Sequence, residues 1–211
     1  MGTDLNLSPV IFEPMIQNVD LKFFFNFRSP YCYLASKTMF SLVDDYRVNF
    51  VWRPLAGWNG RSAPERAKVK IPLTRQDVAR WAKRMNIPCI PPPITTDPTP
   101  AGIGSLLAEE KGCLREYVTG VMDTEWGLGV DIGQTETLVD IARQAGLDPD
   151  EFTAALNDPD RQKVLDDNWN EAQENGVIGV PTFVIDDQIF WGNDRIDFVH
   201  EHLSELGLQK R

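Results

Sequence analysis

The first regular pattern of apolar residues lies in the segment DLKFFFNF, residues 20–27. Every second residue from Leu21 onward is apolar and therefore points to one face of a β-strand, while Phe24 points to the other face. A strand with large apolar side chains on both faces is typical of the interior of a sheet. The pattern predicts a central strand whose main face carries Leu21, Phe23, Phe25 and Phe27.

The next segment changes from strand spacing to helical spacing. Ser29 is a residue type that caps helices, and Pro30 suits the first helical position. The residues that recur at helical spacing are Leu34, Ala35, Thr38, Met39 and Leu42. Alternation then returns in YRVNFVWRPL, residues 46–55, which predicts a second strand. The order so far is strand, helix, strand.

Strand signals are absent from residues 62–176, and helix signals replace them. One helix is expected to open at Thr74, and others cover 113–126 and 135–145. Two Asp-Pro pairs, at 148–149 and 158–159, each match an N-cap followed by the first helical position. The last of these helices is expected to end at Asn175-Gly176. The segment is therefore predicted to be an all-helical insertion.

The final part of the chain predicts two more strands and a helix. The segment PTFVIDDQIFWG, residues 181–192, has two short apolar runs around the turn residues Asp186 and Asp187. An amphipathic tail follows. We therefore expect a loose N-terminal leader over residues 1–18, one α/β domain made of 19–61 and 177–211, and a helical domain over 62–176.

Charge and composition exclude several classes of partner. The chain has 211 residues, with 31 acidic and 21 basic side chains and a formal net charge of −10. Such a charge repels nucleic acid and anionic membranes, and no basic patch stands out in the sequence to offset it. The first twenty residues lack the pattern of a signal peptide, and no stretch approaches the ~18 apolar residues of a membrane span. We expect a cytoplasmic protein.

The cysteines, histidines and tryptophans do not form a recognisable metal or cofactor motif. Three cysteines at wide spacing, Cys32, Cys89 and Cys113, argue against a disulfide framework and a zinc site, so no metal is expected. His200 and His202 lie two apart, where a helix points them in different directions. The tryptophans Trp58, Trp81, Trp126 and Trp169 are interpreted as core residues.

The segment NFRSPYC, residues 26–32, is the first candidate for chemistry. Ser29 could act only as a helix cap, or its hydroxyl and the free amides of the first turn could stabilise an anion such as a thiolate. A thiol-disulfide oxidoreductase needs a cysteine at this place, and serine cannot replace its thiolate. Cys32 is interpreted as a small buried side chain. A site of this kind would be complemented by a thiol from outside, for which glutathione is the obvious candidate.

Two later segments supply further candidates. In GVIGVPTFVI, residues 176–185, Pro181 begins a strand, so the backbone of Val180 could pair with an extended peptide. In FWGNDRID, residues 190–197, Asn193 and Asp194 could cap the final helix. A carboxylate there could equally accept the α-ammonium of a γ-glutamyl group. Both interpretations of this segment stay open.

Four segments, FFFNFRSPYCYLA, QDVARWAKRMNIP, GVIGVPTFVI and FWGNDRID, occur in an order that resembles the 2-hydroxychromene-2-carboxylate isomerases. These enzymes belong with the kappa-class glutathione transferases and the DsbA-type oxidases. The resemblance spans about residues 20–206. It implies an α/β fold of thioredoxin-like type with a large all-helical insertion, as in DsbA.

The resemblance also implies bound glutathione and a homodimer. Ser29 matches the catalytic residue whose hydroxyl donates to the thiolate sulfur, and Val180, before a cis Pro181, matches the residue that pairs with the glutathione backbone. Asn59 is similar to an asparagine that contacts the ligand in the kappa class. The residues expected to hold the γ-glutamyl end are Trp191, Gly192, Asn193 and Asp194.

The activity implied is isomerisation of a small aromatic catabolite. In that reaction the glutathione thiolate adds to an electron-poor double bond, the adduct rotates, and the thiol is expelled. The chain departs from the isomerases around Ile94 and Thr95, where a tyrosine is missing, and at Cys32, where most relatives have serine. The alternatives are a kappa-like transferase and a non-catalytic peptide-binding or chaperone module. A thiol-disulfide oxidoreductase is the least favoured hypothesis.

Overall fold

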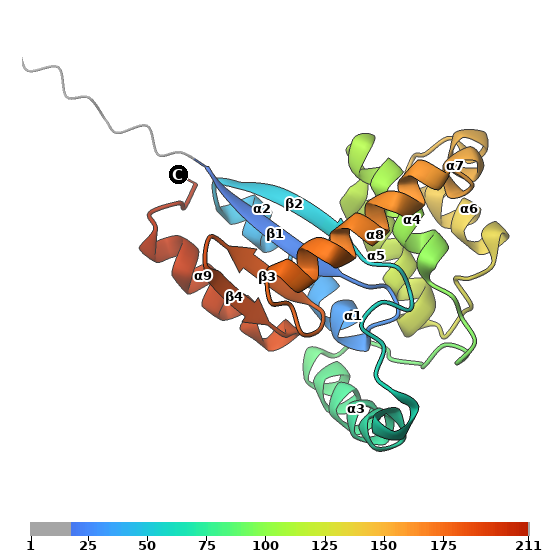
Figure 1. Cartoon of the computed structure of the whole chain (residues 1–211), viewed down its shortest axis with the longest axis horizontal. Coiled ribbons are helices and arrows are strands. Elements are labelled where there is room, and N and C mark those ends of the chain that lie inside the picture. The colour runs from blue at the N-terminus through green and yellow to red at the C-terminus, as the bar shows by residue number, and fades with distance from the viewer. Residues whose placement is uncertain (1–17, 211) are drawn as a thin grey trace, which may run out of the picture.

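A four-stranded sheet forms the centre of the protein (Figure 1). The structure, a computed structural model, describes residues 18–210. The sheet order is β2-β1-β3-β4, with β1 parallel to β2 and the other pairs antiparallel. Apart from Asn18, the leader predicted for residues 1–18 lies outside the described residues. The strands are β1 (Val19–Phe25), β2 (Val48–Pro54), β3 (Thr182–Ile185) and β4 (Gln188–Trp191).

Helices between β2 and β3 make up the insertion. Figure 1 shows α4 to α7 gathered beyond one end of the sheet, with α8 running back across it. The predicted fold class, an α/β sheet interrupted by a large helical insertion, is confirmed. None of the helices between residues 18 and 210 combines the length and apolar character needed to cross a bilayer. The helices are α1 (Pro30–Ser36), α2 (Ser41–Asp45), α3 (Pro64–Met85), α4 (Thr99–Glu110), α5 (Leu114–Met122), the π-helical turn η1 (Asp123–Gly127), α6 (Thr135–Gln144), α7 (Pro149–Leu156), α8 (Pro159–Glu174), the 3₁₀ turn η2 (Asn193–Arg195) and α9 (Ile196–Glu205).

Strand β1 is buried on both faces, as its sequence predicts. Phe23 belongs to the main hydrophobic cluster and stacks on Phe183 of β3 with ring centroids 4.3 Å apart. Phe24 belongs to a second cluster on the opposite face, with Leu55 and Val184. Full burial of one phenylalanine contributes about 1.5–3 kcal/mol to stability, so β1 is a major source of the folding free energy.

The helix predicted from Ser29 through Leu42 is interrupted. α1 ends at Ser36, where the hydroxyl donates to the carbonyl of Tyr33 at 2.7 Å, and Thr38 donates its amide to Ala35 at 3.0 Å. These tighter bonds between residues three apart replace the α-helical ladder. The chain then starts again as α2 at Ser41.

The prediction that a helix opens at Thr74 is wrong, because α3 begins ten residues earlier at Pro64 and contains Pro72. Proline removes one helical hydrogen bond, but this part of α3 is exposed and water can satisfy the freed carbonyl. Helix α4, which follows the proline-rich connection, was not predicted. α3 also gathers seven of the 21 basic residues against two acids, a basic surface that the sequence pattern did not reveal. These are Arg66, Lys68, Lys70, Arg75, Arg80, Lys83 and Arg84.

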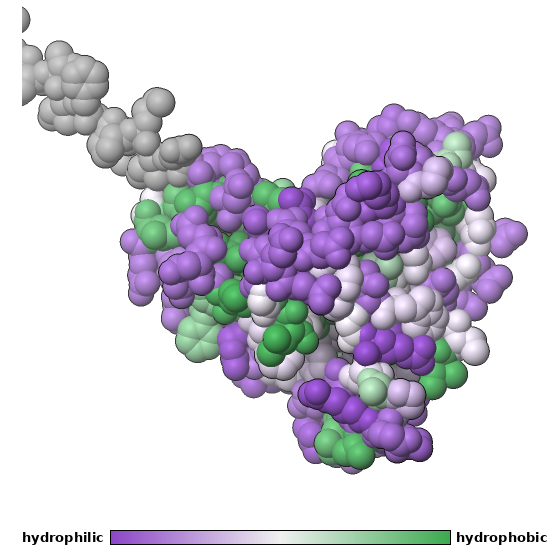
Figure 2. Space-filling view, viewed as in Figure 1, coloured by the Kyte–Doolittle hydropathy of each residue, from purple (hydrophilic) through white to green (hydrophobic). Residues whose placement is uncertain are grey.

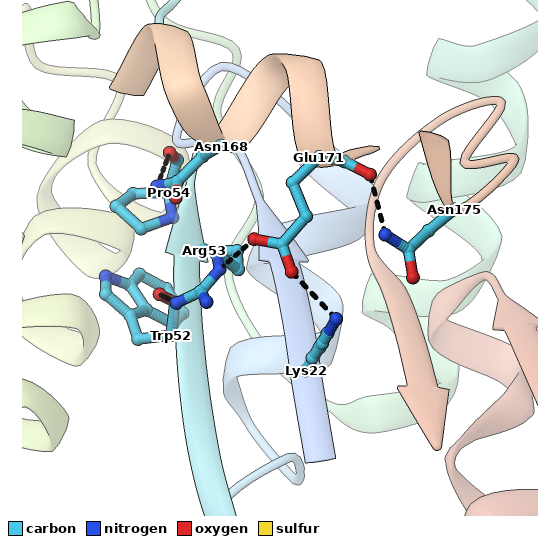
Figure 3. A network of polar contacts seen from close by, with 7 residues as sticks. All are labelled: Lys22, Trp52, Arg53, Pro54, Asn168, Glu171 and Asn175. Carbon is cyan, nitrogen blue, oxygen red and sulfur yellow. Dashed lines mark hydrogen bonds and ion pairs between the residues drawn. The ribbon is translucent and has the colours of Figure 1, made fainter. Parts of the chain in front are cut away.

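Helix α8 is tied to the sheet by a polar network (Figure 3). Glu171 pairs with Lys22 of β1 at 2.8 Å and with Arg53 of β2 at 2.5 Å. Asn168, one turn earlier, donates its Nδ2 to the carbonyl of Pro54 at 2.9 Å. Burial alone would raise the pKa of Glu171, but Lys22 and Arg53 outweigh it and hold the pKa below its usual value.

Replacement of Glu171 tests this network. Glu171→Gln should lower the free energy of unfolding by about 1–2 kcal/mol at neutral pH, since it leaves the partly buried charges of Lys22 and Arg53 without their counter-charge. The pKa of Glu171 is lower in the folded protein than its value of 4.5 in the unfolded chain, so the ionised carboxylate stabilises the fold above pH 4.5. This contribution is lost as the pH falls through the folded-state pKa. The difference between wild type and variant in urea unfolding should therefore shrink below pH 4.5. Glu174→Gln, an exposed change on the same helix, is the control; a difference that persists unchanged at low pH would contradict the assignment.

Candidate functional site

Ser29 lies at the start of α1 and faces the segment before β3. It is the N-cap residue, as predicted, and its Oγ accepts a hydrogen bond from the amide of Cys32 at 3.4 Å. The same Oγ donates to the carbonyl of Val180 at 3.3 Å, across 151 positions of sequence. The structure thus brings together two of the predicted site residues. Capping leaves the hydroxyl proton of Ser29 available for a second partner.

The peptide bond between Val180 and Pro181 is cis, and the segment is fixed from both sides. The carbonyl of Pro181 accepts from the amide of Gly192 at 2.9 Å. Within the described range 18–210, the amide of Val180 has no hydrogen-bond acceptor. A backbone amide and carbonyl at such a position can pair with an extended peptide in the manner of an added strand.

The segment after β4 lies against this turn. Trp191 ends β4 with 52% of its side chain exposed, and it covers Gly179 so closely that a Cβ there would lie 2.8 Å from its Nε1. Gly192 has φ +122°, a conformation that requires glycine, and a Cβ at this position would lie 2.5 Å from Oδ1 of Asp194. The absence of a side chain at Gly179 and Gly192 therefore allows Trp191 and Asp194 to take these positions.

Asn193 and Asp194 do not cap a helix, so that interpretation is wrong. The N-cap of η2 is Gly192 and that of α9 is Arg195, and neither end has a side-chain cap bond. The physical reason is that the 3₁₀ turn places Asn193 and Asp194 inside the first turn instead of before it. Asp194 pairs with its neighbour Arg195 at 2.7 Å on the surface, and η2 contacts α1. The alternative, that these residues hold a ligand, stays a prediction.

Asn59 lies in the loop that follows β2. Its backbone amide donates to the carbonyl of Ala56 at 3.1 Å. Its side-chain Nδ2 is buried and has no acceptor within residues 18–210. An orphaned buried donor is uncommon and calls for a partner. Contact between Asn59 and a ligand stays a prediction.

Asn26, which sequence reasoning did not select, connects this loop to Ser29. Its Nδ2 donates to the carbonyl of Ala56 at 2.9 Å, and its Oδ1 accepts from the amide of Arg28 at 3.0 Å. Asn26 is only 3% exposed. The signal was available in the sequence, because one amide interrupts the apolar run FFFNF and a buried amide must satisfy its hydrogen bonds.

Tyr31 is a second residue that the sequence did not single out. Its hydroxyl donates to Oδ2 of Asp77 on α3 at 2.9 Å. Burial raises the pKa of Tyr31 to about 12, and the hydrogen bond to Asp77 and the charge of Asp194 add to the effect. Tyr31 therefore stays protonated and lies between α3 and η2. The signal in the sequence that could have identified Tyr31 as a site residue was its position directly after Ser29-Pro30.

Cys32 is fully buried in the main hydrophobic cluster, which confirms its interpretation as a small core side chain. Burial raises the pKa of its thiol to about 12, although hydrogen bonds from Asn26 and Ser29 oppose the shift. Burial also raises the pKa values of Cys89 and Cys113, and all three thiols are free. Cys32 cannot supply a thiolate at neutral pH.

The interpretation of Trp58 as a core residue is wrong. Its side chain is 42% exposed in the loop after β2, where Arg28 and Arg61 lie over the ring. A tryptophan can remain at the surface when guanidinium groups cover its faces. Trp81, Trp126 and Trp169 are partly buried and pack against the hydrophobic clusters, as expected.

Figure 2 shows a hollow between α3 and the body of the molecule, beside α1. Helix α1, which Ser29 caps, contacts both α3 and the turn η2, which contains Asn193 and Asp194. A separate open depression of about 460 Å³ lies at the other end of α1 and is lined by Ser36, Phe40, Asp44 and Arg115. It contains none of the candidate residues. Across residues 18–210 no group of three His, Cys, Asp or Glu side chains could hold a metal ion.

Comparisons with known proteins agree with this fold. The sequence model of the DSBA-like thioredoxin domain matches residues 20–204. The chain belongs to the DSBA-like thioredoxin family. The 2-hydroxychromene-2-carboxylate isomerase of Sphingobium xenophagum is 30% identical to it over 198 residues, which cover 90% of this chain and 100% of the relative. The isomerase of the same name from Pseudomonas putida is 28% identical over 193 residues, or 87% and 94% of the two chains.

A solved structure of a 2-hydroxychromene-2-carboxylate isomerase has a TM-score of 0.77 and 26% identity to this DSBA-like chain. The match covers 89% of this chain and 95% of the other. The resemblance drawn from the sequence is therefore confirmed. It extends over nearly all of the described residues, including both halves of the sheet and the helical insertion.

The state of Cys32 is directly testable. In a Cys89→Ser/Cys113→Ser variant, Cys32 is the sole thiol. A pKa near 12 instead of 9 lowers the thiolate fraction about 10³-fold, and burial blocks the reagent further. We expect reaction with a thiol-specific disulfide reagent at pH 8 to be at least about 10³-fold slower than for free glutathione, and fast again in denaturant. Rapid labelling of the native variant would contradict the assignment.

Proposed function

We propose that this protein is a glutathione-dependent isomerase that acts on a small aromatic catabolite, in the manner of 2-hydroxychromene-2-carboxylate isomerase. The observation that carries the proposal is the contact between Ser29 Oγ and Val180 O at 3.3 Å, beside an amide of Val180 that has no acceptor in the described part of the chain. The names of the curated relatives support the same activity.

The residues present fit glutathione. Val180 offers its backbone to the cysteinyl unit, and the orphaned Nδ2 of Asn59 offers a further donor. Asn193 and Asp194 cap no helix, and within the described residues Asp194 pairs only with its exposed neighbour Arg195, so both could bind the γ-glutamyl end together with Trp191 and Gly192. When bound, glutathione would supply the nucleophilic thiolate that adds reversibly to an electron-poor double bond.

Ser29 is the catalytic residue in this proposal. The amide of Cys32 donates a long hydrogen bond of 3.4 Å to Ser29 Oγ, which leaves the hydroxyl proton free for another acceptor. Its present partner, the carbonyl of Val180, is distant at 3.3 Å, so the proton can turn toward a thiolate at small cost. Hydrogen bonds to a charged group are roughly twice as strong as neutral ones, and this difference favours the thiolate.

Two other functions use the same geometry. A kappa-like transferase would need the same Ser29 and the same glutathione contacts, and would differ in leaving glutathione in the product. A peptide-binding or chaperone module would use the backbone of Val180, whose amide has no acceptor within residues 18–210. A thiol-disulfide oxidoreductase is opposed by Ser29 and by the raised pKa of Cys32. A homodimer and a cytoplasmic location remain predictions from the sequence.

The decisive variant is Ser29→Ala. Loss of a hydrogen bond to a charged sulfur should raise the pKa of bound glutathione by about 1–2 units and lower turnover roughly 10- to 100-fold. The pKa is measured from the ultraviolet absorbance of the thiolate, and turnover with a ring-opened aromatic acid. Ser41→Ala, which removes a hydroxyl on α2, is the matched control.

Three results separate the alternatives. An unchanged thiol pKa in Ser29→Ala would refute the role of the hydroxyl. Glutathione recovered in the product by mass spectrometry would favour transfer over isomerisation. Calorimetry that detects no binding of glutathione to the wild type would favour the peptide-binding module.

A further inference from the structure

Two arginines lie against one exposed tryptophan near the start of α1. The guanidinium carbon of Arg61 lies 4.6 Å from the ring centroid of Trp58, and that of Arg28 lies 5.5 Å from it. Arg28 immediately precedes Ser29, whereas Arg61 comes from the loop after β2. A guanidinium that stacks on a ring keeps its N–H groups free at the edges for hydrogen bonds.

The positive charges of Arg28 and Arg61 repel each other, and neither is balanced by an ion pair with a carboxylate of residues 18–210. Burial lowers the pKa of Arg28, and the charge of Arg61 lowers it further. Among the ion pairs formed by residues 18–210, none includes Arg28 or Arg61. A like charge close to a partly buried guanidinium is costly unless an anion joins them.

The carboxylates near Arg28 compensate this charge only in part. Asp97 accepts from the amide and the hydroxyl of Thr99, at 3.0 and 2.6 Å, and is thus occupied by its own loop. Glu125 in η1 is 1% exposed, and its Oε2 has no partner within the described residues. Burial raises the pKa of Glu125 well above its usual value, which favours the neutral acid.

Hydrogen bonds fix the backbone segments that carry Arg28 and Arg61 relative to Ser29. The side chain of Asn26 bonds both the amide of Arg28 and the carbonyl of Ala56, so it joins the two segments that carry the arginines. The indole of Trp126 in η1 donates to the carbonyl of Phe27 at 3.1 Å, directly before Arg28. The unpaired Nδ2 of Asn59 lies in the same loop, between Trp58 and Arg61.

We propose that Arg28 and Arg61, which both stack on Trp58, bind the carboxylate of a ligand in the Ser29 site, with Asn59 as a neutral donor in the same loop as Arg61. The proposal rests on the proposed function and extends it to a subsite that sets ligand choice. Two sources share this chemistry: the glycyl carboxylate of glutathione and the carboxylate of an aromatic acid substrate. Guanidinium groups suit either because they recognise carboxylates through paired N–H bonds.

The test compares each acid with a neutral analogue by calorimetry. Glutathione is compared with its ester at the glycyl carboxylate, and cinnamate with cinnamamide, the second pair with and without saturating glutathione. The variants are Arg28→Leu and Arg61→Leu. Arg143→Leu, which removes an exposed arginine from α6, controls for the change in net charge.

We expect Arg28→Leu and Arg61→Leu each to weaken binding of one of the acids roughly 10- to 100-fold and to leave its neutral analogue unchanged. Arg61→Lys keeps the charge and should recover part of the loss. A selective effect on glutathione identifies the glycyl carboxylate as the ligand group, and a selective effect on cinnamate identifies the substrate. Arg61 is exposed, so its variants should fold even if those of Arg28 do not.

Other results would overturn the subsite. If acid and neutral analogue bind the wild type equally, or if Arg61→Leu leaves their ratio unchanged, the pair binds no carboxylate. If Arg28→Leu and Glu125→Gln lower the melting temperature equally while binding stays unchanged, Arg28 is only a structural partner of Glu125. A wild type that binds cinnamate selectively but not glutathione would refute the proposed function and leave the carboxylate subsite standing.

Discussion

Burial of β1 on both faces fixes the position of the candidate site. A shift of one residue would exchange Phe23 and Phe24 between two separate hydrophobic clusters, so the register of the strand is strongly determined. The strand ends just before Ser29, and its partner β3 pairs Thr182 with Phe24. That pairing carries the residues before β3 past the end of β1. Core packing therefore brings Val180, which packs against both clusters, to Ser29, which belongs to neither.

The end of β1 also explains why a polar side chain is buried beside the site. Asn26 uses its acceptor for the amide of Arg28 and its donor for the carbonyl of Ala56. A single amide thereby satisfies itself and joins two loops. Because an unsatisfied buried amide costs several kcal/mol in an apolar setting, the two loops cannot separate without loss of stability. The geometry of the arginine pair depends on this link.

Local rules could predict the sheet, the Asp-Pro helix starts and the cap at Ser29, because each depends on neighbouring residues. Asp148 and Asp158 indeed accept from amides of their first turns. The start of α3 could not be predicted, since Pro72 signals a break that an exposed helix tolerates. The exposure of Trp58 and the burial of Glu125 could not be predicted for a different reason. Both depend on contacts with segments that are distant in the sequence. The 3₁₀ turn that removes Asn193 and Asp194 from the cap position is likewise set by tertiary contacts with α1.

The distribution of charge shows how an acidic protein can attract acidic ligands. A net charge of −10 repels both glutathione and aromatic carboxylates at long range. The basic residues of α3, together with Arg28 and Arg61, offset part of this charge near α1, since α3 contacts the helix that Ser29 caps. The Debye length is about 8 Å at physiological ionic strength, so a ligand close to α1 responds to these local charges more than to the total. The local field therefore favours entry of an anion at the Ser29 end of α1, where a thiolate would also be stabilised.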